Sequence, residues 1–109
     1  MIWSPSALDD VERIAEYIAR DSAGRAGLFV RRVIEFADRL ESFPRSGRQI
    51  PEIGDPSCRE LIYGAYRVMY RIVAGEVWIT GVVHGARDWR PPVEGEKRGS
   101  GSEASDPLL

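Results

Sequence analysis

The sequence predicts a small α+β domain of order β-α-α-β-β-β, in which a helical hairpin covers one face of a small antiparallel sheet. Apolar residues recur at three- and four-residue spacing between residues 5 and 43, as in amphipathic helices. Apolar and polar residues then alternate between residues 58 and 84, as in half-buried strands. With 109 residues, 43% of them hydrophobic, the chain has enough apolar surface for one core.

The first half of the chain contains the signals of two helices. Ser4 and Pro5 mark a helix start, because a serine side chain accepts hydrogen bonds from free N–H groups and proline is tolerated in the first turn. The apolar spacing then predicts helices over residues 5–20 and 23–43, the second ending before Pro44. Since few residues join them, we expect the two helices to lie antiparallel.

Strands are expected over residues 2–3, 58–63, 66–73 and 76–84. Residues 44–56, rich in proline, glycine and charge, are expected to form a loop. In the third strand Tyr66 and Val68 alternate with Arg67 and Met69, so we expect one face to be buried and Arg67 to lie on an accessible face. An exposed arginine there would contribute little to folding stability.

The chain divides into a domain of residues 1–90 and a tail of residues 91–109. The tail starts with two prolines and then consists mostly of glycine, serine and charged residues. Such a segment has too little apolar surface to offset the entropy lost on ordering. We therefore predict that the tail is disordered.

The composition argues against several classes of protein. Cys58 is the only cysteine, which excludes an internal disulfide framework and a multi-cysteine metal site; we predict no metal site and no cofactor. The sequence shows no secretory signal and no apolar segment of bilayer-spanning length, so we expect a cytoplasmic protein. A net charge of −2 argues against avid nonspecific binding to nucleic acid.

Five segments in order resemble the RelE/ParE superfamily of bacterial toxins over about residues 1–90. They are residues 3–10, leading into the first helix; 43–48, similar to the family's Pro-x-x-Gly-Arg loop; 59–61; 66–71; and 82–88. The last of them, which includes His84, Arg87 and Asp88, resembles the ParE branch more than the RelE branch.

The resemblance implies a growth-inhibiting toxin of a type II toxin–antitoxin system, of the kind that stabilises plasmids, neutralised by a cognate antitoxin. ParE-like members inhibit DNA gyrase through protein contacts, whereas RelE-like members are endonucleases that cut mRNA on the ribosome. A shared fold does not choose between these targets. A third possibility is a member that has lost toxicity and only binds its antitoxin. In each case we expect contact with DNA only indirectly, through the antitoxin.

The resemblance also suggests residues for each target. Arg67, Arg71 and Arg87 are the predicted partner-binding residues. For a RelE-like nuclease, Arg59, Arg67 and Arg87 would hold the scissile phosphate, and His84 or Tyr70 would move protons. The simpler interpretation is that these arginines are solvated, that His84 is an ordinary surface residue, and that the strand tyrosines belong to the core.

Two departures from the RelE pattern argue against an enzyme. No lysine precedes Lys97, and Trp89 stands where a catalytic tyrosine is expected; indole has no acid or base function near neutral pH. We therefore favour the gyrase inhibitor. The antitoxin is expected to dock in the groove between the helical hairpin and the sheet.

Overall fold

The structure, a computed structural model, describes residues 1–85. Residues 1–85 form three helices, α1 (Pro5–Ala19), α2 (Ala23–Ala37) and α3 (Arg39–Ser42). The same part of the chain forms five strands, β1 (Ile2–Trp3), β2 (Arg48–Gln49), β3 (Cys58–Tyr63), β4 (Tyr66–Val73) and β5 (Glu76–His84). The predicted tail, residues 91–109, and Arg87 lie outside the described residues.

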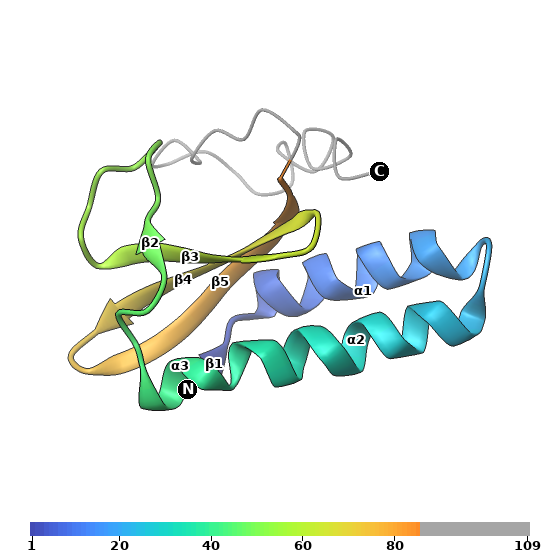
Figure 1. The fold of residues 1–109 in the computed structure, drawn as a ribbon, viewed down its shortest axis with the longest axis horizontal. Helices are drawn as coiled ribbons and strands as arrows, with labels where there is room; N and C mark the ends of the chain where they lie inside the picture. The colour runs from blue at the N-terminus through green and yellow to red at the C-terminus, as the bar shows by residue number, and fades with distance from the viewer. Residues whose placement is uncertain (86–109) are drawn as a thin grey trace.

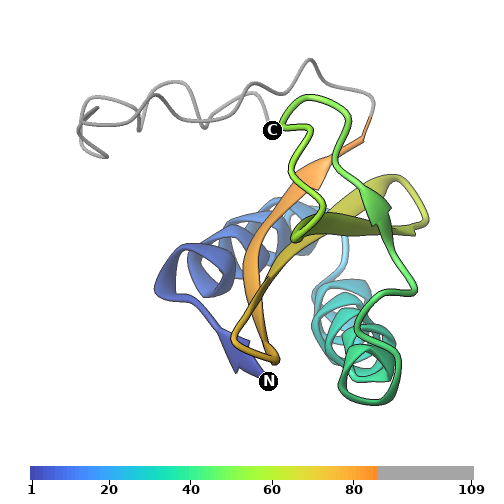
Figure 2. The same ribbon diagram turned by 90° about the vertical axis from the view of Figure 1, so that its left-hand side faces the viewer.

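The strands form one sheet in the order β1-β5-β4-β3-β2. The pairs β2–β3, β3–β4 and β4–β5 are antiparallel, and β1 pairs with β5 in parallel. Figures 1 and 2 show α1 and α2 packed together on one face of this sheet. The predicted α+β fold is therefore confirmed, with one parallel pair added to an otherwise antiparallel sheet.

Local signals account for most of the boundaries. The Ser4 side chain accepts a hydrogen bond from the Ala7 N–H at 3.1 Å and begins α1, and Ser22 accepts one from the Arg25 N–H at 3.1 Å and begins α2. Strands β3, β4 and β5 have the predicted bounds. The single helix predicted over residues 23–43 is wrong in one respect, because a turn at Asp38 divides it into α2 and α3.

The core lies between the helical hairpin and the sheet. All three helices and strands β3, β4 and β5 contribute buried side chains to it, and the largest that are almost completely buried include Ile14, Leu40, Val68, Tyr70 and Ile79. The register of β4 with β5 shifts by one residue between Met69 and Tyr70, and this bulge lets Val77, Ile79 and Val82 of β5 all enter the core. We call the opposite side of the sheet its outer face.

The edge of the sheet at β5 is only partly covered by a strand, because β1 is two residues long and β5 is nine. Beyond β1, a side chain of α1 contacts the edge of β5. The Asp10 side chain on α1 accepts a hydrogen bond from the Val82 N–H at 3.0 Å. It also forms an ion pair with Arg13. The Asp10 carboxylate therefore has a structural role at this edge of the sheet.

No helix within residues 1–85 is long and apolar enough to cross a lipid bilayer.

Candidate functional site

Arg67 lies on the outer face of the sheet, as the alternation predicted, but it is not accessible. It sits opposite Ile62 on one neighbouring strand and Val83 on the other, and only 5% of its surface is exposed. The expectation of an exposed guanidinium is therefore wrong. The physical reason is that the loop predicted over residues 44–56 folds back across this part of the sheet.

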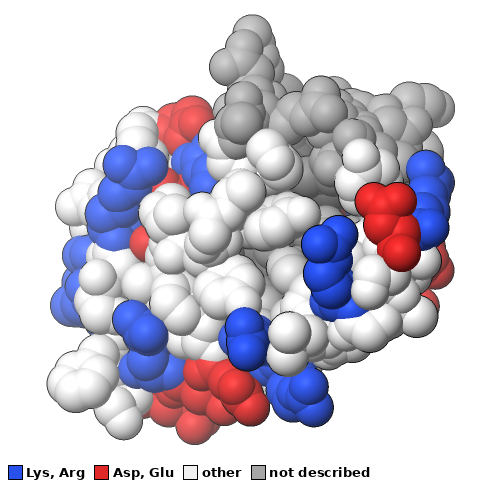
Figure 3. Space-filling model, turned by 45° about the vertical axis from the view of Figure 1, so that its right-hand side comes forward, with Lys and Arg blue, Asp and Glu red and all other residues white. Residues whose placement is uncertain are grey.

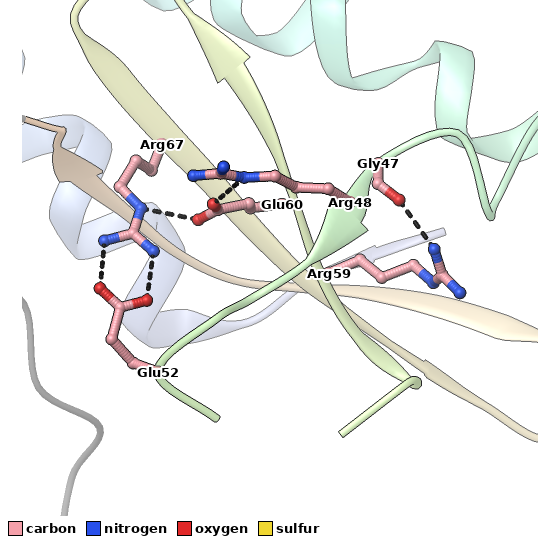
Figure 4. Close-up of polar contacts among 6 residues, drawn as sticks. All are labelled: Gly47, Arg48, Glu52, Arg59, Glu60 and Arg67. Carbon is pink, nitrogen blue, oxygen red and sulfur yellow. Dashed lines mark hydrogen bonds and ion pairs between the residues drawn. The ribbon is translucent and has the colours of Figure 1, made fainter. Parts of the chain in front are cut away.

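Two carboxylates enclose the Arg67 guanidinium (Figure 4). Its Nε donates to Glu60 Oε1 at 2.6 Å. Its two terminal nitrogens donate to the two oxygens of Glu52 at 3.0 and 2.8 Å, which is the bidentate geometry that suits a planar guanidinium. These contacts raise the pKa of Arg67, chiefly through Glu52, and the same hydrogen bonds hold the pKa of Glu52 below its ordinary value.

Glu60 is the central residue of this network. Its side chain is completely buried, and its second oxygen accepts a hydrogen bond from Arg48 Nε at 2.7 Å. A buried carboxylate is tolerated only when it is paired and hydrogen-bonded, and here two guanidinium groups satisfy both oxygens. Arg48, Glu52, Glu60 and Arg67 together form what we call the outer-face ion network.

The loop that carries this network is held in place by a second set of contacts. We call residues 44–57 the covering segment. The Tyr70 hydroxyl donates to the Pro44 carbonyl at 2.6 Å and accepts from the Gly47 N–H at 2.9 Å. Arg59 donates to the Gly47 carbonyl at 2.9 Å and to that of Pro56 at 2.9 Å.

Gly47 can only be glycine in this packing. A Cβ at this position would lie 2.5 Å from the Glu60 carbonyl oxygen and 2.7 Å from the Tyr70 hydroxyl. Both distances are shorter than any van der Waals contact, so the absence of a side chain lets the covering segment approach the sheet. The glycine of the Pro-x-x-Gly-Arg loop therefore has a physical role here.

Among residues 1–85, the predicted site residues lie on both faces of the sheet. Arg59 shares its face of β3 with core residue Leu61, opposite Tyr70, and so lies on the other side of the sheet from Arg67. Arg71 is exposed on the outer face, two residues beyond the buried Met69. Arg59 and Arg67, two of the three arginines expected to hold the phosphate in a RelE-like nuclease, therefore lie on opposite faces of the sheet.

His84 lies at the end of β5 on the helix side, opposite Tyr66. The two rings meet edge to face with their centroids 5.5 Å apart. It is partly buried rather than free on the surface. Arg87, the remaining predicted site residue, is outside the described residues. Within residues 1–85, no three His, Cys, Asp or Glu side chains are grouped as a metal site would require.

Sequence reasoning missed Glu52 and Glu60 as partners of Arg67. A signal for Glu60 existed, because the two-residue turn between β3 and β4 fixes their register and places Glu60 diagonally across from Arg67. No sequence signal identified Glu52, whose position depends on the path of the covering segment. The short strand β2 was missed for the same reason.

Charge is spread rather than concentrated on the face drawn in Figure 3. Several basic side chains run down the left-hand edge of this view and others lie singly elsewhere, while acidic side chains lie beside basic ones at the lower edge and on the right. Among the described residues of this face, acidic and uncharged side chains interrupt the basic ones, whereas a surface that tracks a nucleic-acid backbone is continuously basic.

A helical hairpin on one face of a five-stranded, mostly antiparallel sheet defines the class of protein as a small α+β fold of the RelE/ParE type. The solved structure of a chromosomal ParDE toxin–antitoxin system from P. aeruginosa has a similar fold. Its TM-score is 0.64 and its identity 20%, and the match covers 75% of this chain and 90% of that one. No curated protein matches the sequence.

The family is identified by sequence. The model of the ParE toxin of the type II toxin–antitoxin system, parDE, matches residues 1–89, and the chain belongs to this family. It is a ParE-type toxin, and membership implies a cognate antitoxin as its partner. The predicted resemblance, with its preference for the ParE branch, is confirmed.

Proposed function

We propose that this toxin arrests growth by binding DNA gyrase in the cytoplasm through protein contacts, that its cognate antitoxin prevents this, and that the pair stabilises the replicon that carries it. The observation that carries the proposal is the enclosure of Arg67. A phosphate approaching this part of the outer face would meet Glu52 and Glu60, whose negative charges oppose it, at an arginine already bound by both.

The separation of the other candidates supports the same conclusion. Stabilising a phosphorane needs cationic donors aimed at one point and a proton-transfer group within hydrogen-bond reach of the reacting oxygen. Arg59 is used to hold two backbone carbonyls on the helix side of β3, whereas Arg67 is on the outer face. Both arginines have structural partners, which fits a toxin that acts by binding.

For the antitoxin we propose the border between α2 and β3. Phe36 and Tyr63 are partly exposed there, with their ring centroids 5.1 Å apart. Arg39 lies over the Phe36 ring at 4.2 Å and adds a positive charge. An antitoxin segment that folds on binding would cover these rings with apolar side chains and place a carboxylate near Arg39.

The test uses purified gyrase and relaxed plasmid. Toxin in excess should abolish supercoiling, and prior addition of the cognate antitoxin should restore it. A second arm adds the toxin to ribosomes programmed with mRNA and maps cleavage at the A site. Cleavage there without any effect on gyrase would overturn the proposal in favour of a RelE-like endonuclease.

A further inference from the structure

The most exposed large apolar side chain among the described residues belongs to Phe43, which directly follows α3. It is 66% exposed, compared with 39% for Ile53 in the same loop. Phe43, Pro44, Arg45 and Ser46 line an open hollow of about 400 Å³ whose walls are mainly apolar. Exposing an aromatic ring beside an apolar hollow is unfavourable in water, which makes this loop a candidate contact surface.

Hydrogen bonds attach the backbone of this loop to α3 and to the sheet. The Phe43 N–H donates to the Arg39 carbonyl at 2.9 Å, and the Ser46 N–H donates to the Phe43 carbonyl at 3.1 Å. Tyr70 ties Pro44 and Gly47 to the sheet, as described above. A contact loop that is already fixed loses little conformational entropy when it binds, so its side chains can contribute more of their contact energy.

The charge around the hollow is positive, although the whole chain carries −2. Residues 39–48 contain three arginines and one acid, Glu41, and that acid pairs with the N-terminal ammonium at 3.3 Å. Arg48 is paired with Glu60, whereas the Arg45 side chain makes no hydrogen bond or ion pair with any residue of 1–85. Arg45 is therefore available to a carboxylate supplied from outside.

We infer that the Phe43 loop, residues 43–46, is a contact surface for the toxin's protein target, and that it binds an acidic surface segment with one bulky apolar side chain. The apolar side chain fills the hollow against Phe43, and a neighbouring carboxylate pairs with Arg45. Aromatic and arginine side chains are the residue types that dominate binding energy in protein interfaces. The inference rests on the proposed function in taking a protein as the target.

Two alternatives fit the loop less well. A nucleobase would need donors and acceptors for its edges, and the hollow is lined mainly by apolar atoms. An antitoxin segment that folds as it binds can adapt to a groove, whereas a preformed hollow on a fixed loop suits a folded surface that docks with little rearrangement. We therefore assign the loop to the target and not to the antitoxin.

The test uses Phe43→Ser and Arg45→Glu in the full chain. The matched controls are Ile53→Ser, which removes another exposed apolar side chain, and Arg25→Glu, which reverses another exposed charge. Melting temperatures should stay at the wild-type value, since each altered side chain is exposed. Growth arrest after expression without antitoxin, inhibition of purified gyrase, and binding to the cognate antitoxin are then measured for each variant.

Phe43→Ser and Arg45→Glu should each need at least about tenfold more toxin to arrest growth and to inhibit gyrase, while the controls behave as wild type. Affinity for the antitoxin should be unchanged. Phe43→Tyr, which keeps the ring, should retain most of the toxicity and guards against a folding defect in the serine variant.

The remaining outcomes are decisive in the other direction. Folded variants that stay fully toxic but escape the antitoxin would make the loop an antitoxin surface and overturn the inference. Full toxicity with normal antitoxin binding overturns it as well. If the wild type arrests growth without inhibiting gyrase, the proposed target is wrong. The inference about the loop is then decided by whether Phe43→Ser and Arg45→Glu arrest growth less than their controls. A wild-type chain that does neither overturns both proposals.

Discussion

The outer face of the sheet has two halves that differ in what covers them. In the covered half, Glu60, Arg67 and Met69 are buried, and the outer-face ion network joins this half to the covering segment. In the open half, Arg71 is exposed, together with the apolar side chains Ile2, Val73 and Trp78. Arg67 and Arg71 occupy the same face of the same strand, four residues apart, so the path of a loop alone decides which arginine is structural.

The largest effect should follow from breaking the covered half at Arg67. Arg67→Ala leaves Glu60 buried with Arg48 as its one partner. It also removes the two hydrogen bonds that Glu52 accepts from the guanidinium. Removing one member of a buried ion pair typically costs about 3–5 kcal/mol. Urea unfolding should therefore show a loss of free energy of unfolding in this range. A loss below about 1 kcal/mol would contradict the buried position of Arg67 and would mean that its side chain is solvated.

A smaller effect is expected where the covering segment is attached to the sheet. Tyr70→Phe keeps the ring but removes the hydroxyl that joins Pro44 and Gly47. Leaving two such groups unpartnered should reduce the free energy of unfolding by about 1–3 kcal/mol. Tyr63→Phe is the matched control, because its hydroxyl makes no hydrogen bond with residues 1–85, and it should unfold like the wild type. Equal losses in the two variants would show that the Tyr70 bridge contributes nothing.

Acid should reduce the stability that the contact between Glu52 and Arg67 contributes to the covered half. Hydrogen bonds from Arg67 lower the pKa of Glu52 below its ordinary value of 4.5. The stability this group contributes is therefore fully present above pH 4.5 and is lost as the pH falls through the lower pKa of the folded state. The free energy of unfolding of Glu52→Gln should fall less between pH 5 and pH 3 than that of the wild type. If the free energies of unfolding of the two proteins fell in parallel with pH, the hydrogen bonds from Arg67 would not lower the pKa of Glu52.

The smallest change in stability is expected in the open half. Arg71→Ala should alter the free energy of unfolding by no more than about 0.5 kcal/mol, since its side chain is solvated. The same variant tests the predicted partner-binding role of Arg71, because binding to the antitoxin or to gyrase should weaken while folding does not. Unchanged binding to both partners would remove Arg71 from the binding surface.

The elements that could be predicted from sequence are those specified by local pattern. The alternation in residues 66–73 placed Tyr66 and Val68 toward the helices and Arg67 away from them, and the structure has this arrangement. Serine caps and two-residue turns likewise fixed the ends of helices and strands. These signals are local because backbone periodicity and hydrogen bonding within a few residues determine them.

The burial of Arg67 was not predictable in the same way. Alternation gives the face on which a side chain lies, but not whether a distant loop covers that face. The covering segment reaches Arg67 through Glu52, fifteen residues earlier, and its path depends on the tight approach of Gly47 to the sheet. Only tertiary packing specifies these contacts, so the candidate site was predicted in its residue types but not in its accessibility.

The hydrogen bond from Val82 to Asp10 has a consequence for how copies of this chain can meet. An exposed strand edge offers unpaired N–H and C=O groups to any other strand, and proteins that leave such an edge open tend to associate edge to edge. Here β1 pairs with the first part of β5. Just beyond it, the Val82 N–H already donates a hydrogen bond to the Asp10 carboxylate of α1. A second molecule that added a strand at this edge would first have to displace a charged group already bound there. The Asp10 carboxylate thus makes the Val82 N–H unavailable to a strand of a neighbouring molecule.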